Sequence, residues 1–237
     1  MKIKKIQEKL TEIGVNVEDI PMGDFDYIGE YTARKNRGSE SENYKKFGCF
    51  FRPNYERGIL IYYLIKHFNI KSVLEIGFGR GYSTFCAAKA MTDAGIEGEI
   101  VTVDPALNKD QIQPLTKIFP RAWFEKIEFS KTFSDDFFKK DERRFDLVYI
   151  DGDHRYDAVK KDWDNSKKIF NKFVLFDDYH LPGKQQKDIE CAKLINEIED
   201  PSKELIIMDR RMFYDDRRFS DEEIDYGQVL ISKERSN

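Results

Sequence analysis

Short apolar runs and longer segments with helical spacing alternate along most of the chain. Seven runs of mainly β-branched and aromatic residues predict strands, at residues 73–76, 100–103, 124–129, 145–150, 173–176, 205–208 and 228–231. Segments with helical spacing lie between most of them, at residues 55–68, 82–91, 112–119, 133–140, 158–170 and 188–198. This alternation predicts an α/β fold, a Rossmann-like doubly wound sheet of seven mostly parallel strands. Because no long helical segment separates the last two strands, we expect them to form an antiparallel terminal hairpin.

The residues before this pattern predict an N-terminal extension. Ile3, Ile6, Leu10 and Ile13 would lie on one side of a short amphipathic helix. Residues 21–52 have neither period but are rich in aromatic side chains, which indicates a cap or lid over a substrate site. An arm that only packs on the core or on a second subunit is the alternative. We therefore divide the chain into an N-terminal helix and cap, residues 1–52, and an α/β domain, residues 53–237.

Composition narrows the class of partner and the compartment. Lys and Arg number 40 against 44 Asp and Glu, a net charge of −4, which disfavours nucleic acid as a partner. The cysteines, Cys49, Cys86 and Cys191, lack metal-ligand spacing and are typical of reduced intracellular thiols. The longest apolar run, residues 58–65, is far below the ~20 residues that span a bilayer. We expect a soluble cytoplasmic protein without a membrane partner, and exposed aromatics in the cap would suit a homodimer.

A glycine-rich turn follows the strand at residues 73–76. Gly77, Gly79 and Gly81 occupy alternate positions, so the backbone can turn sharply and approach a ligand without an intervening Cβ. An ordinary strand-to-helix connection is the alternative interpretation.

The next strand ends in an acid, Asp104, which could accept hydrogen bonds from ribose hydroxyls. That position supports a nucleoside ligand at the glycine turn. The spacing Gly-x-Gly-x-Gly, with Glu75 two residues before it, disfavours a nicotinamide cofactor.

Three further acids follow the fourth and fifth predicted strands. Asp151 ends one strand, and Asp177 and Asp178 end the other. Neighbouring strands lie about 4.8 Å apart, so these carboxylates can converge, and they would repel one another unless a cation lies between them. Oxygen ligands favour Mg²⁺, with Ca²⁺ and Mn²⁺ as the other candidates. The alternative is that these acids cap the following helix and turn.

His154 begins the helix after the fourth strand. The positive end of a helix dipole disfavours imidazolium, so the ring would be neutral and could act as a general base toward a nearby hydroxyl.

The segment Val73-Leu74-Glu75-Ile76-Gly77-Phe78-Gly79-Arg80-Gly81 resembles the first motif of class I S-adenosylmethionine-dependent methyltransferases, acidic-x-Gly-x-Gly-x-Gly. The resemblance covers about residues 55–233. It implies that the three glycines flank the methionyl part of S-adenosylmethionine and that Asp104 holds the ribose. Ser83 would assist, and Ser130 lies where the adenine is expected.

Two later motifs carry a narrower resemblance. Asp151-Gly152-Asp153-His154-x-Tyr156 and Asp177-Asp178-Tyr179-His180 are similar to the macrocin O-methyltransferase type of metal-dependent enzyme. That resemblance implies a divalent cation on Asp151, Asp177 and Asp178, with Asp151 also bordering the cofactor.

The same resemblance implies an O-methyltransferase acting on a hydroxyl of a small molecule, such as a sugar or a catechol-like diol. Either His154 or Asp153 would remove the hydroxyl proton. A non-catalytic S-adenosylmethionine-binding module and an NAD-dependent oxidoreductase are the alternatives.

Overall fold

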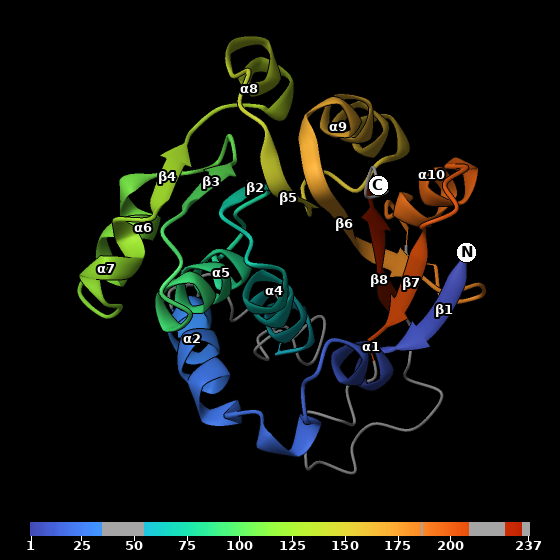
Figure 1. Ribbon diagram of the computed structural model, residues 1–237. Coiled ribbons are helices and arrows are strands. Elements are labelled where there is room, and N and C mark those ends of the chain that lie inside the picture. Colours follow the sequence, from blue (N-terminus) through green and yellow to red (C-terminus); the bar gives the residue numbers. More distant parts are fainter. Residues whose placement is uncertain (35–54, 186, 209–225, 234–237) are drawn as a thin grey trace.

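The computed structural model describes residues 1–34, 55–185, 187–208 and 226–233 (Figure 1). Its centre is an eight-stranded sheet in the order β1-β7-β8-β6-β5-β2-β3-β4. The strands are β1 Lys2–Lys5, β2 Ser72–Ile76, β3 Glu99–Val103, β4 Ile127–Ser130, β5 Phe145–Ile150, β6 Phe170–His180, β7 Glu204–Ile207 and β8 Tyr226–Ser232. β8 runs antiparallel to both β6 and β7, while the remaining pairs are parallel. The predicted α/β class, mostly parallel sheet and terminal hairpin are confirmed, but the strand count is eight and not seven.

The additional strand is β1, in a segment for which the sequence predicts helix. Residues Lys2–Lys5 pair in parallel with β7, and the helix α1 begins only at Ile6 and extends to Glu12. Ile3, expected on the apolar side of the helix, is 61% exposed, whereas Ile6 and Leu10 are fully buried. The edge of β7 offers a row of unpaired backbone N–H and C=O groups, and β1 satisfies them. Local hydrophobic spacing carries no information about that distant edge.

Helices cover both faces of the sheet (Figure 1). One face carries α1, the 3₁₀ turn η1 Val17–Asp19, α2 Met22–Arg34, α4 Tyr55–Phe68, α5 Tyr82–Asp93, α6 Lys109–Leu115 and α7 Arg121–Phe124. The other face carries α8 Ser134–Lys140, α9 Tyr156–Ile169 and α10 Cys191–Glu197. The two cores follow the alternation of side chains along the strands: Val73 and Leu147 enter the first, and Leu74 and Val148 enter the second.

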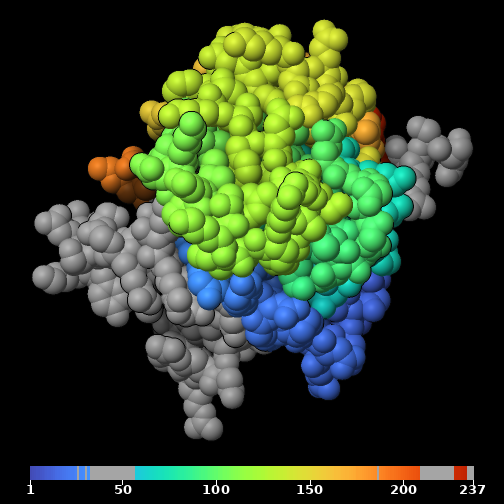
Figure 2. Space-filling view, turned by 90° about the vertical axis from the view of Figure 1, so that its left-hand side faces the viewer, coloured from blue at the N-terminus to red at the C-terminus, as the bar shows by residue number. Residues whose placement is uncertain are grey.

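Part of the predicted cap is helical. Residues 22–34 form α2, for which the sequence predicts an irregular segment. Phe25 and Ile28 are buried in the first core, and the Tyr27 hydroxyl donates a hydrogen bond to the Ile118 carbonyl oxygen at 3.0 Å. These tertiary contacts stabilise a helix that contains Gly23 and Gly29. Figure 2 shows α2, in blue, packed below the green segments at the β4 edge. Residues 35–52 of the predicted cap lie outside the described residues.

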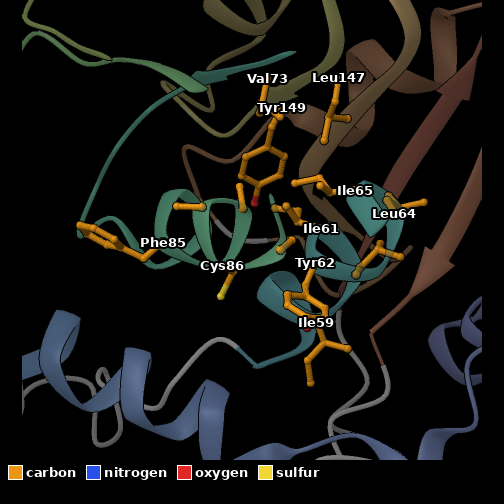
Figure 3. Close-up of a cluster of buried hydrophobic side chains, with 14 of the residues drawn as sticks. Ile59, Ile61, Tyr62, Leu64, Ile65, Val73, Phe85, Cys86, Leu147 and Tyr149 are labelled. Carbon is orange, nitrogen blue, oxygen red and sulfur yellow. The ribbon is translucent and has the colours of Figure 1, made fainter. Parts of the chain in front are cut away.

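The approach of α4 to α5 brings the start of α4 toward the sheet. A Cβ on Gly58 would lie 2.5 Å from the Cys86 sulfur, so only glycine allows these helices to pack this closely. Tyr149 of β5 points toward both helices, among Ile61, Ile65 and other apolar side chains of the first core (Figure 3). No helix in the described part of the chain is long and apolar enough to cross a membrane.

The strand register aligns the ends that carry the predicted site. Ile76 of β2 pairs with Val103 of β3 and with Ile150 of β5, and Ile150 pairs with Phe176 of β6. The residues that follow these four positions therefore meet at one edge of the sheet; they are Gly77, Asp104, Asp151 and Asp177.

Candidate active site

The glycine turn is shaped by the close approach of β5. Gly77 has φ +96°, and a Cβ there would lie 2.1 Å from the backbone oxygen of Asp151. No side chain fits between these strand ends, so position 77 requires glycine. Gly79 has φ +52° and no heavy atom within 4 Å of the position a Cβ would take. The turn therefore leaves bare backbone open beside Gly79.

Glu75 and Ser83, both predicted to contact the cofactor, form hydrogen bonds beneath the glycine turn. The buried Glu75 carboxylate accepts hydrogen bonds from the Ser83 and Thr84 hydroxyls and, at 2.7 Å, from the Thr102 hydroxyl. Burial raises the pKa of Glu75 to about 7, although these three hydrogen bonds oppose the shift. Glu75 and Ser83 thus hold the start of α5 against β2 and β3, and neither lines the cavity described below.

Asp104 stabilises the glycine turn through hydrogen bonds to its backbone. One carboxylate oxygen accepts hydrogen bonds from the backbone N–H groups of Phe78 at 3.1 Å and Gly79 at 3.2 Å, and the other accepts one from Ala106 at 2.7 Å. Asp104 also lines the cavity, whereas Ser130 does not. The Ser130 backbone oxygen accepts a hydrogen bond from the Asp104 N–H at 3.1 Å.

A cavity of about 1000 Å³ extends from the turn across the strand ends. Its walls contain many of the predicted residues, namely Gly77, Gly79, Asp104, Asp151, Asp153 and His154. They also contain residues that the sequence did not single out. Phe133 and Ser134 lie at the start of α8, and Asp162 lies in α9. The glycine turn and the proposed base therefore border one space.

The three predicted metal ligands surround an arginine. Arg57 Nε lies 2.7 Å from Asp177 Oδ2, Nη2 lies 2.6 Å from Asp178 Oδ1, and Nη1 lies 3.6 Å from Asp151 Oδ2. Burial lowers the pKa of Arg57, but the charges of the three acids outweigh it and the pKa is raised. The guanidinium thus supplies positive charge that the sequence pattern attributes to a metal ion.

Strand alternation explains why Asp177 faces Arg57. Leu175 and Asp177 lie on the α4 side of β6, as do Leu147 and Tyr149 on β5. Asp177 also accepts hydrogen bonds from the Tyr149 hydroxyl at 2.9 Å and from Gln228 Nε2 at 3.3 Å. Both of these partners are buried.

Asp178 departs from the regular alternation. Its φ is +51°, and the β6–β8 register shifts between residues 176 and 179. β6 therefore continues through both acids to His180, whereas the sequence predicts that the strand closes before them. The irregularity brings the Asp178 carboxylate to Arg57 and also to His154, whose Nε2 lies 3.4 Å from Oδ2.

The residues that could bind one metal ion differ from the three predicted metal ligands. Atoms of Asp151, His154 and Asp178 that could bind a metal ion all lie within 4.8 Å of one another, and Asp177 is not part of this group. Burial raises the pKa of Asp151, and the neighbouring charge of Asp177 raises it further, although Arg57 opposes this. This is the electrostatic situation that a bound cation relieves.

The two candidate bases are held differently. His154 Nδ1 lies 3.7 Å from the Cys191 sulfur at the start of α10, which leaves Nε2 directed to Asp178. Asp153 instead pairs with Arg155, whose Nε donates to both carboxylate oxygens at 2.9 Å. Hydrogen bonding from Arg155 lowers the pKa of Asp153, which makes it a weaker base.

Sequence comparison identifies the central part of the chain. Residues 74–179 match the model of a methyltransferase domain. The chain contains a methyltransferase domain. Its matched region starts in β2 and ends in β6, and so includes the glycine turn and every acid of the cluster. The predicted methyltransferase class is thereby confirmed.

Solved structures of methyltransferases share the fold. The O-methyltransferase TomG from Streptomyces achromogenes, involved in tomaymycin synthesis and solved with S-adenosylmethionine, has a TM-score of 0.59 at 15% identity, covering 86% of this chain and 87% of its own. Cofactor-bound Rv0187 from MTB has a TM-score of 0.60 at 16% identity and 97% coverage of both chains. An O-methyltransferase from Bacillus cereus in complex with SAH has a TM-score of 0.56 at 14% identity and 97% coverage of both chains. None of the curated proteins matches the sequence.

Proposed function

We propose that the methyltransferase domain transfers the methyl group of S-adenosylmethionine to a hydroxyl oxygen of a small molecule. The observation that carries the proposal is the single cavity that joins Gly77, Gly79 and Asp104 to His154. A sulfonium beside the glycine turn and an acceptor hydroxyl beside His154 would share this space, which is the positioning that the reaction needs. The small-molecule class is supported by the solved O-methyltransferases of the same fold, among them the TomG enzyme of tomaymycin synthesis.

His154 is the proposed base. Its Nε2 would take the proton of the acceptor hydroxyl, the oxygen would form a bond to the methyl carbon, and the carbon–sulfur bond would break to leave S-adenosylhomocysteine. Asp178, 3.4 Å from Nε2, would stabilise the imidazolium that forms. Asp153 is the weaker candidate because Arg155 holds its carboxylate.

The donor set fits a divalent cation. Asp151 and Asp178 offer carboxylate oxygens close to each other, as Mg²⁺ requires, and we propose that these two residues hold the ion. Asp177 is the least suited of the three predicted ligands, because the Tyr149 hydroxyl and Gln228 Nε2 donate hydrogen bonds to it in addition to its ion pair with Arg57. When bound, such an ion lowers the pKa of a hydroxyl and orients it.

Charge supports the same assignment. When all three carboxylates are ionised, one guanidinium leaves two negative charges uncompensated, which is the charge that one divalent cation neutralises. Arg57 and a cation would therefore complement each other, with Arg57 fixing Asp177 on the α4 side of the cluster.

Calorimetric titration with S-adenosylmethionine, S-adenosylhomocysteine and Mg²⁺ tests binding, and transfer of a labelled methyl group to a panel of sugars and catechols tests the reaction. We expect nucleoside binding, and transfer that Mg²⁺ supports and a chelator abolishes. Failure to bind either nucleoside would refute the proposal. Binding without transfer to any acceptor would favour the non-catalytic module, and full activity in chelator would remove the cation from the mechanism.

A further inference from the structure

Arg57, in the first turn of α4, lies against both carboxylates that are proposed to hold the cation. Its Nη2 is 2.6 Å from Asp178 Oδ1, and its Nη1 is 3.6 Å from Asp151 Oδ2. The other oxygen of Asp178, Oδ2, faces His154 Nε2 at 3.4 Å. One oxygen of each carboxylate is therefore paired with a guanidinium whose positive charge is part of the protein.

The guanidinium is fixed from the protein interior. Its Nε lies 2.7 Å from Asp177 Oδ2, and the Asp177 side chain has no exposed surface. The Tyr149 hydroxyl and Gln228 Nε2 also donate hydrogen bonds to Asp177, which hold this carboxylate in place. Moving the guanidinium away would leave Asp177 as a buried charge without its ion pair, which is costly. A cation bound by the other two acids would therefore remain next to Arg57.

A fixed positive charge beside a cation site has two opposite effects. Without a cation, it offsets part of the repulsion among the three acids, so the cluster can stay buried in the folded protein. With a divalent ion present, it repels that ion across a short distance in a partly buried site, where screening by water and salt is weak. The three acids thus attract a cation, and Arg57 opposes its binding.

We propose that Arg57 is an internal competitor of the divalent cation, which holds the acid cluster together when no ion is bound and lowers the affinity of Asp151 and Asp178 for the ion. The inference rests on the proposed function, because it assumes a divalent cation at these two carboxylates. It goes beyond charge balance, since removing Arg57 should tighten cation binding while it destabilises the cation-free protein. Arg57 is then not a ligand but the residue that sets the affinity of the site.

Calorimetric titration of the metal-free protein with Mn²⁺ tests this role. Arg57→Met and Arg57→Gln remove the charge and should lower the Kd for Mn²⁺ about tenfold or more relative to wild type. Arg57→Lys keeps the charge without the forked contacts, so its Kd should stay within about threefold of the wild-type value. A merely structural role predicts the opposite, because loss of the guanidinium contacts would loosen the acids and weaken binding in all three variants. Arg121→Met changes an exposed arginine of α7 and should bind the ion like the wild type.

Urea unfolding with and without Mn²⁺ gives a second readout. An ion that binds only the folded protein stabilises it by mass action, so the same Mn²⁺ concentration should raise the unfolding midpoint of Arg57→Met more than that of the wild type. Arg57→Gln covers a failure of Arg57→Met to fold in chelator, because its amide can still donate a hydrogen bond to Asp177. If neither neutral variant folds even with Mn²⁺, the cation does not replace the guanidinium and the inference is overturned.

The outcomes separate this inference from the proposed function. Mn²⁺ binding by the wild type, with equal or weaker binding by the folded neutral variants, would refute only the role of Arg57. Mn²⁺ binding by the neutral variants alone would support that role. No ion binding by any of these proteins would overturn the inference and remove the cation from the mechanism, whereas failure to bind S-adenosylhomocysteine would refute the methyltransferase proposal itself.

Discussion

Replacing Arg57 by methionine should strongly destabilise the protein, because it leaves three carboxylates without their internal cation. The Arg57 side chain is 19% exposed and Asp177 is fully buried, with 2.7 Å between Nε and Oδ2. Removing one partner of a buried ion pair costs about 3–5 kcal/mol, since the remaining charge is stranded. The partial exposure of Arg57 and Asp178 places the expected loss at the lower end, about 3 kcal/mol.

Urea unfolding followed by tryptophan fluorescence measures this loss, with chelator present so that no added cation compensates for it. The double variant Arg57→Met with Asp177→Asn removes the stranded charge, so it should be less destabilised than the two single losses combined. We expect a coupling energy of about 1–3 kcal/mol from the cycle.

Arg121→Met is the matched control. Arg121 pairs with Glu125 on the surface, where the two side chains are 91% and 59% exposed, and such pairs contribute about 0–1 kcal/mol. If Arg57→Met cost no more than Arg121→Met, or if the cycle gave no coupling, the electrostatic account of the cluster would be wrong.

Three further predictions concern the turn and the base. Gly77→Ala should lower the free energy of unfolding in urea by about 2–4 kcal/mol, because the new Cβ is strained at positive φ and also clashes with the Asp151 backbone. Gly14→Ala is the control, since Gly14 has positive φ but open space around it. Equal losses of stability in the two variants would contradict the clash. Burial raises the pKa of Glu75 from an ordinary 4.5 to about 7, so its contribution is fully present below pH 4.5 and is lost as pH rises to 7. Wild type should therefore lose about 3 kcal/mol relative to Glu75→Gln across that window, and parallel stability curves would refute the shift. His154→Ala should lower kcat about 10²–10⁴-fold in the methyl-transfer assay while S-adenosylhomocysteine binding persists, and a larger loss in Asp153→Asn would exchange the two roles.

The sequence predicted the sheet well where its signal is local. Buried parallel strands are apolar runs bounded by polar residues, and β2, β3 and β5 satisfy that rule. β1 does not, because Lys2–Lys5 is a strand only through its pairing with β7. The helix α2 is a similar case, since its buried positions gain their stability from contacts with α4 and α5.

The candidate site divides in the same way. By itself the sequence determined that a glycine turn and acids meet at one sheet edge, because parallel strands end together and residues after aligned strand ends are neighbours. Only the tertiary structure decided their partners. Arg57 meets Asp177 because Gly58 lets α4 pack closely on α5, and Asp162 reaches the cavity because α9 lies over the second face of the sheet. Such pairings depend on how helices pack, and residues more than a hundred positions apart carry no local signal of it.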